Sequence, residues 1–175
     1  DIRRMATVAG QCGALLAVDN TFLSPALQKP LTLGADIVVH STTKYLNGHS
    51  DVVGGAVLAA TKELAEQLDW WANCLGLTGA PFDAYLTLRG VRTLYARMQQ
   101  HEKNAQALAE RLNEHAAVDK VYYPGLSGHD GPAVAASKQS GFGGMVSFEL
   151  AGGEHAVRAF RERPRLFSLA ESLGG

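Results

Sequence analysis

The sequence has few cysteines, little net charge and no long apolar run. Its two cysteines, Cys12 and Cys74, cannot form a disulfide framework and match no metal-ligand spacing. The 16 basic and 17 acidic residues leave a formal net charge of −1, without the basic footprint of a nucleic-acid or membrane binder. No apolar stretch approaches the length that crosses a bilayer. We therefore expect no nucleic-acid partner, no membrane and a reducing, cytoplasmic location.

The length and composition suit a soluble chain with a core of ordinary size. With 175 residues and 46% hydrophobic content, the chain can hold one domain or a domain and a half. It starts at Asp1 and not at an initiator methionine, so we expect an interior piece of a longer protein. We predict a domain boundary that separates residues 1–95 from residues 96–175.

The first half of the chain alternates between helix and strand signals. Residues 2–12 carry apolar side chains at helical spacing, and the apolar run 15–18 is typical of a buried parallel strand. We then predict a helix over 25–33, a strand over 36–39 and a strand over 52–60. This alternation favours a layered α/β domain.

The second half begins with helices and ends with an alternating strand. Thr61 caps a predicted helix that runs to residue 75, and Pro81 opens a long helix towards residue 114 that Gly90 interrupts or bends. Residues 145–150 have one apolar and one mixed face, which predicts an antiparallel sheet covered on one side. The other predicted elements are a strand over 121–123, a loop over 124–132 and a helix over 133–138.

Lys44 is the strongest candidate for chemistry because it follows the buried strand 36–39. Open α/β sheets bind ligands at the carboxyl ends of their strands, where a cation needs a chemical reason. A lysine amine there can form a Schiff base. Asp19 ends the preceding strand, so two parallel strands would bring a carboxylate and an amine to one crevice. Pyridoxal phosphate needs this pair, a lysine for its aldehyde and an acid for its pyridine nitrogen.

Asp19 has an alternative role, because its carboxylate can cap the turn formed with Asn20 and Thr21. Two hydroxyl residues, Ser41 and Thr43, precede Lys44 in a turn of the kind that can hold a phosphate. The same hydroxyls also fit an ordinary polar loop.

The remaining conspicuous residues favour structural roles. His40 and His49 flank the lysine loop and are more typical of satisfied structural groups than of bases or ligands. Trp70 and Trp71 favour core or subunit packing over substrate stacking. The glycine-rich segment 141–144 precedes a strand, whereas a dinucleotide-binding loop follows one, so we reject that function for it.

Several segments together resemble the Cys/Met-metabolism family of pyridoxal-phosphate enzymes. The resemblance covers essentially the whole chain, with its motifs in the family's order. Within the family, residues 70–73, with Trp70 and Trp71, and the segment 19–33 most resemble the bacterial members that form cystathionine. The segments are AVDNTF at 17–22, ADIVVHSTTKY at 35–45, PFDAYLTLRG at 81–90, GFGGM at 141–145 and AESLGG at 170–175.

The resemblance implies an α/β fold, that of the fold-type-I pyridoxal-phosphate-dependent transferases. Residues 1–95 would be the end of the large cofactor-binding domain, and residues 96–175 the start of the small α+β C-terminal domain. It also implies a dimer or tetramer of identical subunits with shared active sites. The family's stacking tyrosine and its carboxylate-binding arginine have no counterpart in this chain, so we expect other residues to complete the site.

The resemblance assigns roles to six residues. Lys44 would bind the aldehyde of pyridoxal 5'-phosphate and move protons, and Asp19 would pair with its pyridine nitrogen. Ser41 and Thr43 would bind its phosphate. Ser172 would lie near the substrate carboxylate, and Glu171 would influence which substrate is chosen.

The implied activity is a γ-replacement on small amino-acid substrates. An O-succinyl- or O-acetylhomoserine and L-cysteine would give cystathionine and the free acid. Two alternatives from the same family are cleavage of cystathionine by a gamma-lyase and use of sulfide by a sulfhydrylase. An alternative of another class is a non-catalytic protein that binds the cofactor.

Overall fold

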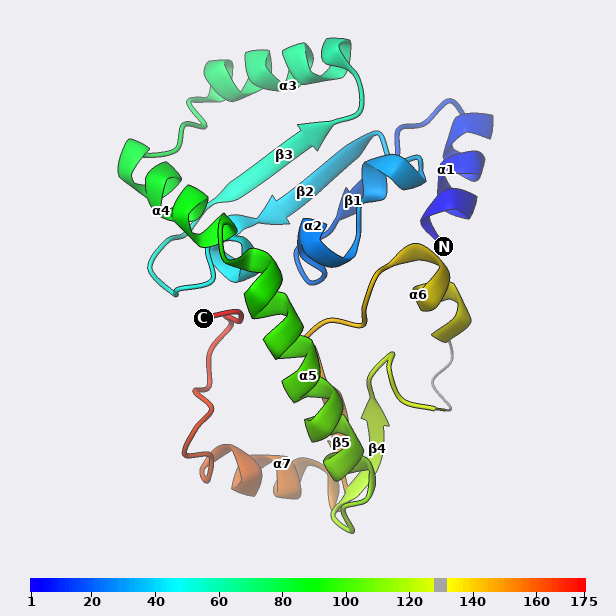
Figure 1. The fold of residues 1–175 in the computed structure, drawn as a ribbon, viewed down its shortest axis with the longest axis vertical. Coiled ribbons are helices and arrows are strands. Elements are labelled where there is room, and N and C mark those ends of the chain that lie inside the picture. Colours follow the sequence, from blue (N-terminus) through cyan, green and yellow to red (C-terminus); the bar gives the residue numbers. More distant parts are fainter. Residues whose placement is uncertain (128–131) are drawn as a thin grey trace.

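The computed structural model describes residues 1–127 and 132–175 (Figure 1), so part of the predicted loop 124–132 lies outside the described residues. The described chain forms two sheets, and a long helix, α5 (Leu94–Asn113), lies between them in the sequence. We call the part of the chain before α5 the first section and the part after it the second section. α5 packs against elements of both sections. None of the described helices is long and apolar enough to cross a membrane. The helices that flank the first sheet are α1 (Ile2–Gln11), α2 (Ser24–Leu27) and α3 (Lys62–Leu75).

The first sheet has the order β1-β2-β3 and confirms the predicted α/β character. β1 (Ala17–Asp19) and β2 (Ile37–Ser41) run parallel, with Asp19 opposite Val39, whereas β3 (Gly55–Ala59) is antiparallel to β2. Because β1 and β2 are parallel, their carboxyl ends lie at one edge of the sheet. This edge carries Asp19 and the turn that contains Lys44.

The predicted helix over residues 25–33 is wrong, because the structure has two short pieces there. α2 ends at Leu27, and a 3-10 turn, η1 (Pro30–Leu33), follows it. Gln28 and Lys29 between them are not helical. The physical reason is Pro30, which excludes the helical backbone conformation from the residue before it.

α3 confirms its predicted ends but not the predicted burial. The Thr61 side chain accepts a hydrogen bond from the Leu64 N–H, and Gly76 ends the helix with φ of 70°. Trp70 and Trp71 stack edge to face, yet they are 58% and 55% exposed. They do not pack in the core of this chain, which leaves subunit packing as the open alternative.

The long helix predicted for residues 81–114 is two helices, α4 (Pro81–Val91) and α5 (Leu94–Asn113). The break comes after Gly90, whose carbonyl accepts hydrogen bonds from both the backbone N–H and the hydroxyl of Thr93. Gly90 lies within α4 and is needed there for packing, because a Cβ at this position would overlap the Asn47 carbonyl. The predicted boundary at residues 95/96 lies in the first turn of α5.

The second section is built on a two-stranded antiparallel sheet of β4 (Val118–Tyr122) and β5 (Ser147–Leu150). Phe148 and Leu150 are half-buried while Ser147 and Glu149 are exposed, which confirms the predicted alternation. The remaining helices of this section are α6 (Pro132–Lys138) and α7 (Gly153–Arg161), and α7 packs on β5.

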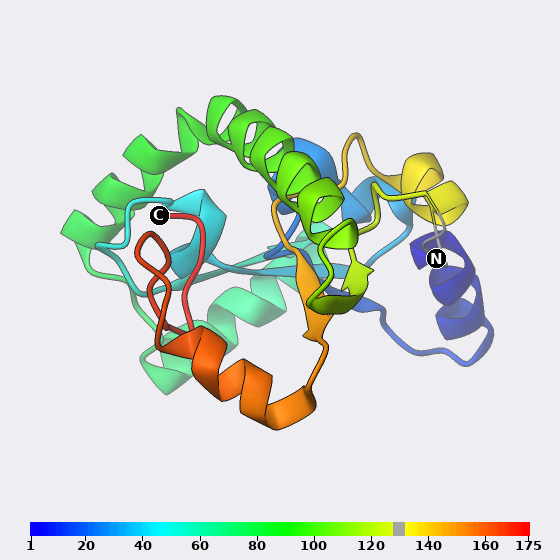
Figure 2. The ribbon, with the colours of Figure 1, turned by 90° about the horizontal axis from the view of Figure 1, so that it is seen from below.

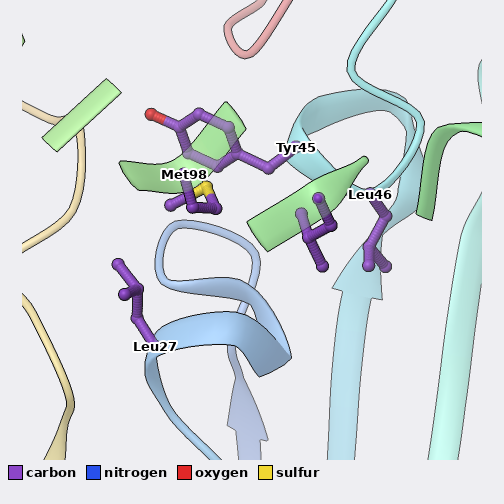
Figure 3. Close-up of a cluster of buried hydrophobic side chains, with 5 residues drawn as sticks. Leu27, Tyr45, Leu46 and Met98 are labelled. Carbon is purple, nitrogen blue, oxygen red and sulfur yellow. The ribbon is translucent and has the colours of Figure 1, made fainter. Parts of the chain in front are cut away.

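Two apolar clusters form the core, and α5 contributes to both. The first cluster (Figure 3) joins the start of α5 to α2 and to the turn that carries Lys44; its buried members are Leu27, Tyr45, Leu46, Leu94 and Met98. The second cluster joins the later part of α5 to the second section; its buried members are Ala105, Ala109 and Tyr123. The site therefore lies next to the first cluster.

Candidate functional site

Asp19 lies exposed at the carboxyl end of β1. Its Oδ1 accepts a hydrogen bond of 2.9 Å from the Thr21 N–H, which confirms the predicted turn cap. The Thr21 side chain and backbone together hold the pKa of Asp19 below its ordinary value, so the carboxylate is ionised at neutral pH. No hydrogen bond to Oδ2 is seen in the described chain. The cap and a second function are compatible, because each carboxylate oxygen can serve one of them.

Thr21 also connects Asp19 to Ser41, a role that its place in the turn after Asp19 did not predict. Its Oγ1 accepts a hydrogen bond of 2.8 Å from the Ser41 N–H. The ends of β1 and β2 are thereby fixed to each other. As a result, the predicted nitrogen-binding acid and the predicted phosphate-binding serine belong to one hydrogen-bonded unit.

The Thr43 hydroxyl is already engaged with the backbone ahead of β3. It accepts a hydrogen bond of 3.0 Å from the Gly54 N–H and lies 3.3 Å from the Gly54 carbonyl oxygen. The Thr42 N–H donates to the same carbonyl. The long contact to the carbonyl is the weaker one, and the hydroxyl proton is free to turn towards a stronger acceptor.

Lys44 lies in η2 (Thr42–Leu46), a single helical turn directly after β2. Its own backbone has φ of −91° and ψ of −128°, outside the helical range, so the turn changes direction at the lysine. The Nζ amine donates a hydrogen bond of 2.6 Å to the carbonyl oxygen of Glu171, which is 127 residues away in the sequence. The amine therefore lies against the C-terminal segment of the chain.

The segment around Glu171 and Ser172 returns to η2, as both Figure 1 and Figure 2 show at the chain's C-terminal end. Leu173 packs against the first cluster. A Cβ at Gly174 would lie only 2.9 Å from the Tyr45 ring, which shows how closely the segment approaches. The structure thus brings Glu171 to Lys44 through its carbonyl, whereas the Ser172 side chain is exposed.

His40 is buried in β2, with only 4% of its surface exposed. Burial lowers its pKa below the ordinary value, and the nearby Asp19 charge opposes this effect. A neutral imidazole is therefore favoured, but its buried Nδ1 has no hydrogen-bond partner in the described chain, so His40 is not the satisfied structural group that was expected. No group of acidic, histidine and cysteine side chains that could hold a metal ion occurs within residues 1–127 and 132–175.

The residues that carry an amine, an ionised carboxylate and two hydroxyls thus lie at or just after the ends of β1 and β2, at the edge where open α/β sheets bind their ligands. Residues 1–175 match the family model described as "Cys/Met metabolism PLP-dependent enzyme", and the chain belongs to this family. Its members depend on pyridoxal phosphate.

Three known proteins illustrate the similarity. Cystathionine gamma-synthase of Escherichia coli K12 is 54% identical over the whole chain. Cystathionine gamma-lyase of Bacillus subtilis 168 is 51% identical over 174 residues, 99% of this chain and 46% of the lyase. The crystal structure of cystathionine gamma synthase from Xanthomonas oryzae pv. oryzae, in complex with aminoacrylate and cysteine, superposes with a TM-score of 0.97 at 66% identity over the whole chain.

These relatives are much longer than the chain. The chain spans 45% of the length of the Escherichia coli enzyme and 45% of the Xanthomonas oryzae chain. Relatives named as gamma-synthases, gamma-lyases and beta-lyases match at 51–54% identity. The overall similarity therefore places the chain among cystathionine synthases and lyases without selecting one of them.

Proposed function

We propose that the chain is part of an enzyme that makes cystathionine by γ-replacement in methionine and cysteine metabolism. The Cγ–O bond of an O-succinyl- or O-acetylhomoserine breaks and the cysteine sulfur bonds to Cγ, while the released carboxylate and the thiol proton together make the free acid. The hydrogen bond between Lys44 and the Glu171 carbonyl carries the proposal, because it brings the predicted cofactor lysine to the predicted substrate segment. The 66% identity to a gamma-synthase structure supports this reaction.

The side chains at the sheet edge fit pyridoxal phosphate by their chemistry. Asp19 is held ionised, with an oxygen available to accept a hydrogen bond from a protonated ring nitrogen. Ser41 and Thr43 supply hydroxyl donors for a phosphate. Lys44 supplies the amine for the aldehyde. When bound, the cofactor withdraws electrons from the substrate carbon next to the amine.

We assign the proton movements to Lys44 and the electrostatic control to Asp19. With the cofactor bound, the Lys44 amine would take the proton from Cα of the substrate and assist at Cβ. Asp19 keeps a proton on the ring nitrogen, and Thr21 keeps Asp19 ionised for that purpose. Thr43 turns its hydroxyl from the Gly54 carbonyl towards the phosphate. Glu171 and Ser172 lie where they can influence the choice of substrate.

The first test is optical and uses the full-length protein. Bound cofactor gives a yellow absorbance band that Lys44→Ala should abolish, whereas Asp19→Asn should retain bound cofactor but lower turnover severely. Colour that survives Lys44→Ala would remove Lys44 from its role. Near-normal turnover in Asp19→Asn would contradict the role given to the carboxylate.

A substrate assay separates the synthase from the lyase, for which the 51% identity to the Bacillus subtilis enzyme argues. The full-length protein is given O-succinylhomoserine with cysteine, then O-succinylhomoserine with sulfide, then cystathionine alone. The proposal expects the highest kcat/KM in the first assay. A preference for sulfide would indicate a sulfhydrylase, and a preference for cystathionine would indicate a lyase. Absence of turnover despite bound cofactor would indicate a non-catalytic protein.

We also propose that the enzyme is a dimer or tetramer of identical subunits. α3 and α4 expose large apolar side chains that this chain leaves uncovered: Trp70, Trp71, Leu75, Phe82, Tyr85 and Leu88. Contiguous exposed apolar surface is typical of interaction sites. Light scattering of the full-length protein should give a multiple of the subunit mass, and a monomer would contradict the proposal.

A further inference from the structure

Arg97, in the second turn of α5, connects three parts of the chain next to the lysine turn. Its Nη1 donates a hydrogen bond of 2.8 Å to the carbonyl of Tyr45, the residue directly after Lys44. Its Nη2 donates to the Gly90 carbonyl at 2.9 Å, and its Nε donates to the Thr93 hydroxyl at 3.1 Å. One guanidinium therefore holds η2, the end of α4 and the start of α5 together.

The surroundings of the guanidinium are built to admit it. Gly48 leaves the necessary space, because a Cβ there would overlap the Arg97 Nη1. The acceptors of its hydrogen bonds are carbonyl and hydroxyl oxygens, and no carboxylate forms a salt bridge with it in the described part of the chain. Arg97 is half-buried, and this burial lowers its pKa. A charge paired only with neutral groups is a costly way to stabilise a fold.

The bond to Tyr45 bears on the orientation of Lys44. The chain leaves the helical conformation at Lys44, so no regular helix fixes the lysine side chain. The residue after it is fixed on both sides instead. The Tyr45 ring packs against His101 at a tilt of 58° with centroids 5.2 Å apart, and the Tyr45 carbonyl is held by Arg97. The fork of a guanidinium can hold two acceptors in one geometry, which a lysine cannot do.

We propose that Arg97 is a positioning residue, which fixes the backbone of the lysine turn so that the Lys44 amine reaches the reacting atoms. This inference rests on the proposed function of Lys44. Arg97 itself touches neither substrate nor cofactor in the proposal. Its contribution is the two-carbonyl fork and not its charge.

The test uses three variants of the full-length holoenzyme and one control. Arg97→Met removes the fork and the charge, and Arg97→Lys keeps the charge without the fork. Thr93→Val removes the acceptor of Nε together with the hydroxyl's own hydrogen bond to the Gly90 carbonyl, and it is the milder change should Arg97→Met not fold. Arg111→Met is the matched control, because Arg111 is an exposed arginine at the other end of the same helix.

We expect kcat to fall on the order of tenfold to a hundredfold in both Arg97→Met and Arg97→Lys, with KM little changed, because small displacements of a reacting group cost about this much. Amide hydrogen exchange should accelerate in residues 42–48 and stay unchanged in β4, which separates a local effect from a general loss of stability. Thr93→Val should show a smaller effect in the same direction, and Arg111→Met none.

The proposal would be overturned by wild-type kcat and unchanged exchange of residues 42–48 in Arg97→Met. Wild-type behaviour of Arg97→Lys would also overturn it, because charge alone would then suffice. If the wild-type protein lacked the cofactor absorbance, the proposed function would fail. The exchange of residues 42–48 in the variants would still report independently whether Arg97 holds the turn.

Discussion

The two ends of α5 differ in the size of the side chains that they bury against the rest of the chain. At its start, α5 contributes large side chains, Leu94 and Met98, which reach the short pieces α2 and η2. Further along, it contributes the small residues Ala105 and Ala109, and the large buried side chain is Tyr123, which follows β4. At its start the helix therefore adds large side chains to those of its neighbours, whereas further along it contributes only small buried residues.

The difference follows from what each end must hold. A single turn such as η2 cannot cover its own apolar side chains, Tyr45 and Leu46, so the large side chains of the helix are needed to bury them. The small alanine side chains of the helix instead let the chain after β4 approach closely, and Tyr123 is fully buried against them in the second cluster. Changes in the first cluster should therefore reach the lysine turn, whereas changes in the second should not.

The largest expected effect is that of Met98→Ala in the first cluster. Met98 is fully buried, so its truncation should lower the free energy of unfolding by about 2–5 kcal/mol. It should also accelerate hydrogen exchange in residues 42–48, because Met98 packs with Tyr45. Leu108→Ala, on the same helix but 39% exposed, is the control for denaturant unfolding. An equal loss of unfolding free energy in both variants would contradict the role given to the large buried side chains at the start of α5.

The second-largest effect on stability is expected from overpacking the face of α5 that carries Ala105 and Ala109. Ala109→Leu inserts bulk at a residue with no exposed surface and should cost about 1–3 kcal/mol in denaturant unfolding. Cofactor absorbance and exchange of residues 42–48 should stay as in the wild type. Ala107→Leu, at an exposed position two residues away, should be nearly neutral. A loss of cofactor in Ala109→Leu would show that the two ends are not independent.

Tyr123→Phe should have a smaller effect, of about 1 kcal/mol, because it removes one hydrogen bond from the buried hydroxyl to the Gly143 carbonyl. Burial raises the pKa of Tyr123 to about 12. The unfolded chain therefore loses this proton first, and the stability of the wild type should fall as the pH rises from about 10 towards 12. Between pH 10 and pH 12 the free energy of unfolding should depend less steeply on pH in Tyr123→Phe than in Tyr95→Phe, whose ring is 61% exposed. Equal profiles would exclude Tyr123 as the titrating group.

The smallest expected effect is a pH dependence of the free energy of unfolding that arises from His40 and His101. Burial lowers the pKa of His40 and of His101 below 6.5. The unfolded chain binds these protons more readily, so stability is full above about pH 6.5 and falls as the pH decreases through the folded pKa values. His40→Gln should reduce this slope in thermal unfolding between about pH 7 and pH 5. An unchanged slope would mean that His40 does not contribute.

The parts of the structure that could be predicted depend on signals within a few residues. The end caps of α3, the alternation in β5 and the strands before Asp19 and Lys44 all follow from local pattern. The break at Pro30 was missed although its signal is local, because the apolar pattern continued across it. Trp70 and Trp71 were partly misjudged, because apolar character does not say whether the cover comes from the same chain.

The sequence by itself determined the α/β order, the family and the placement of Asp19 and Lys44 at the ends of two neighbouring parallel strands, because strand ends and turn residues are read over short distances. Only the tertiary structure decided that the Glu171 carbonyl meets Lys44 from 127 residues away and that Arg97 holds Tyr45 from 52 residues away. Such contacts depend on how helices and turns pack in three dimensions. Periodicity and spacing along the chain carry no record of that packing.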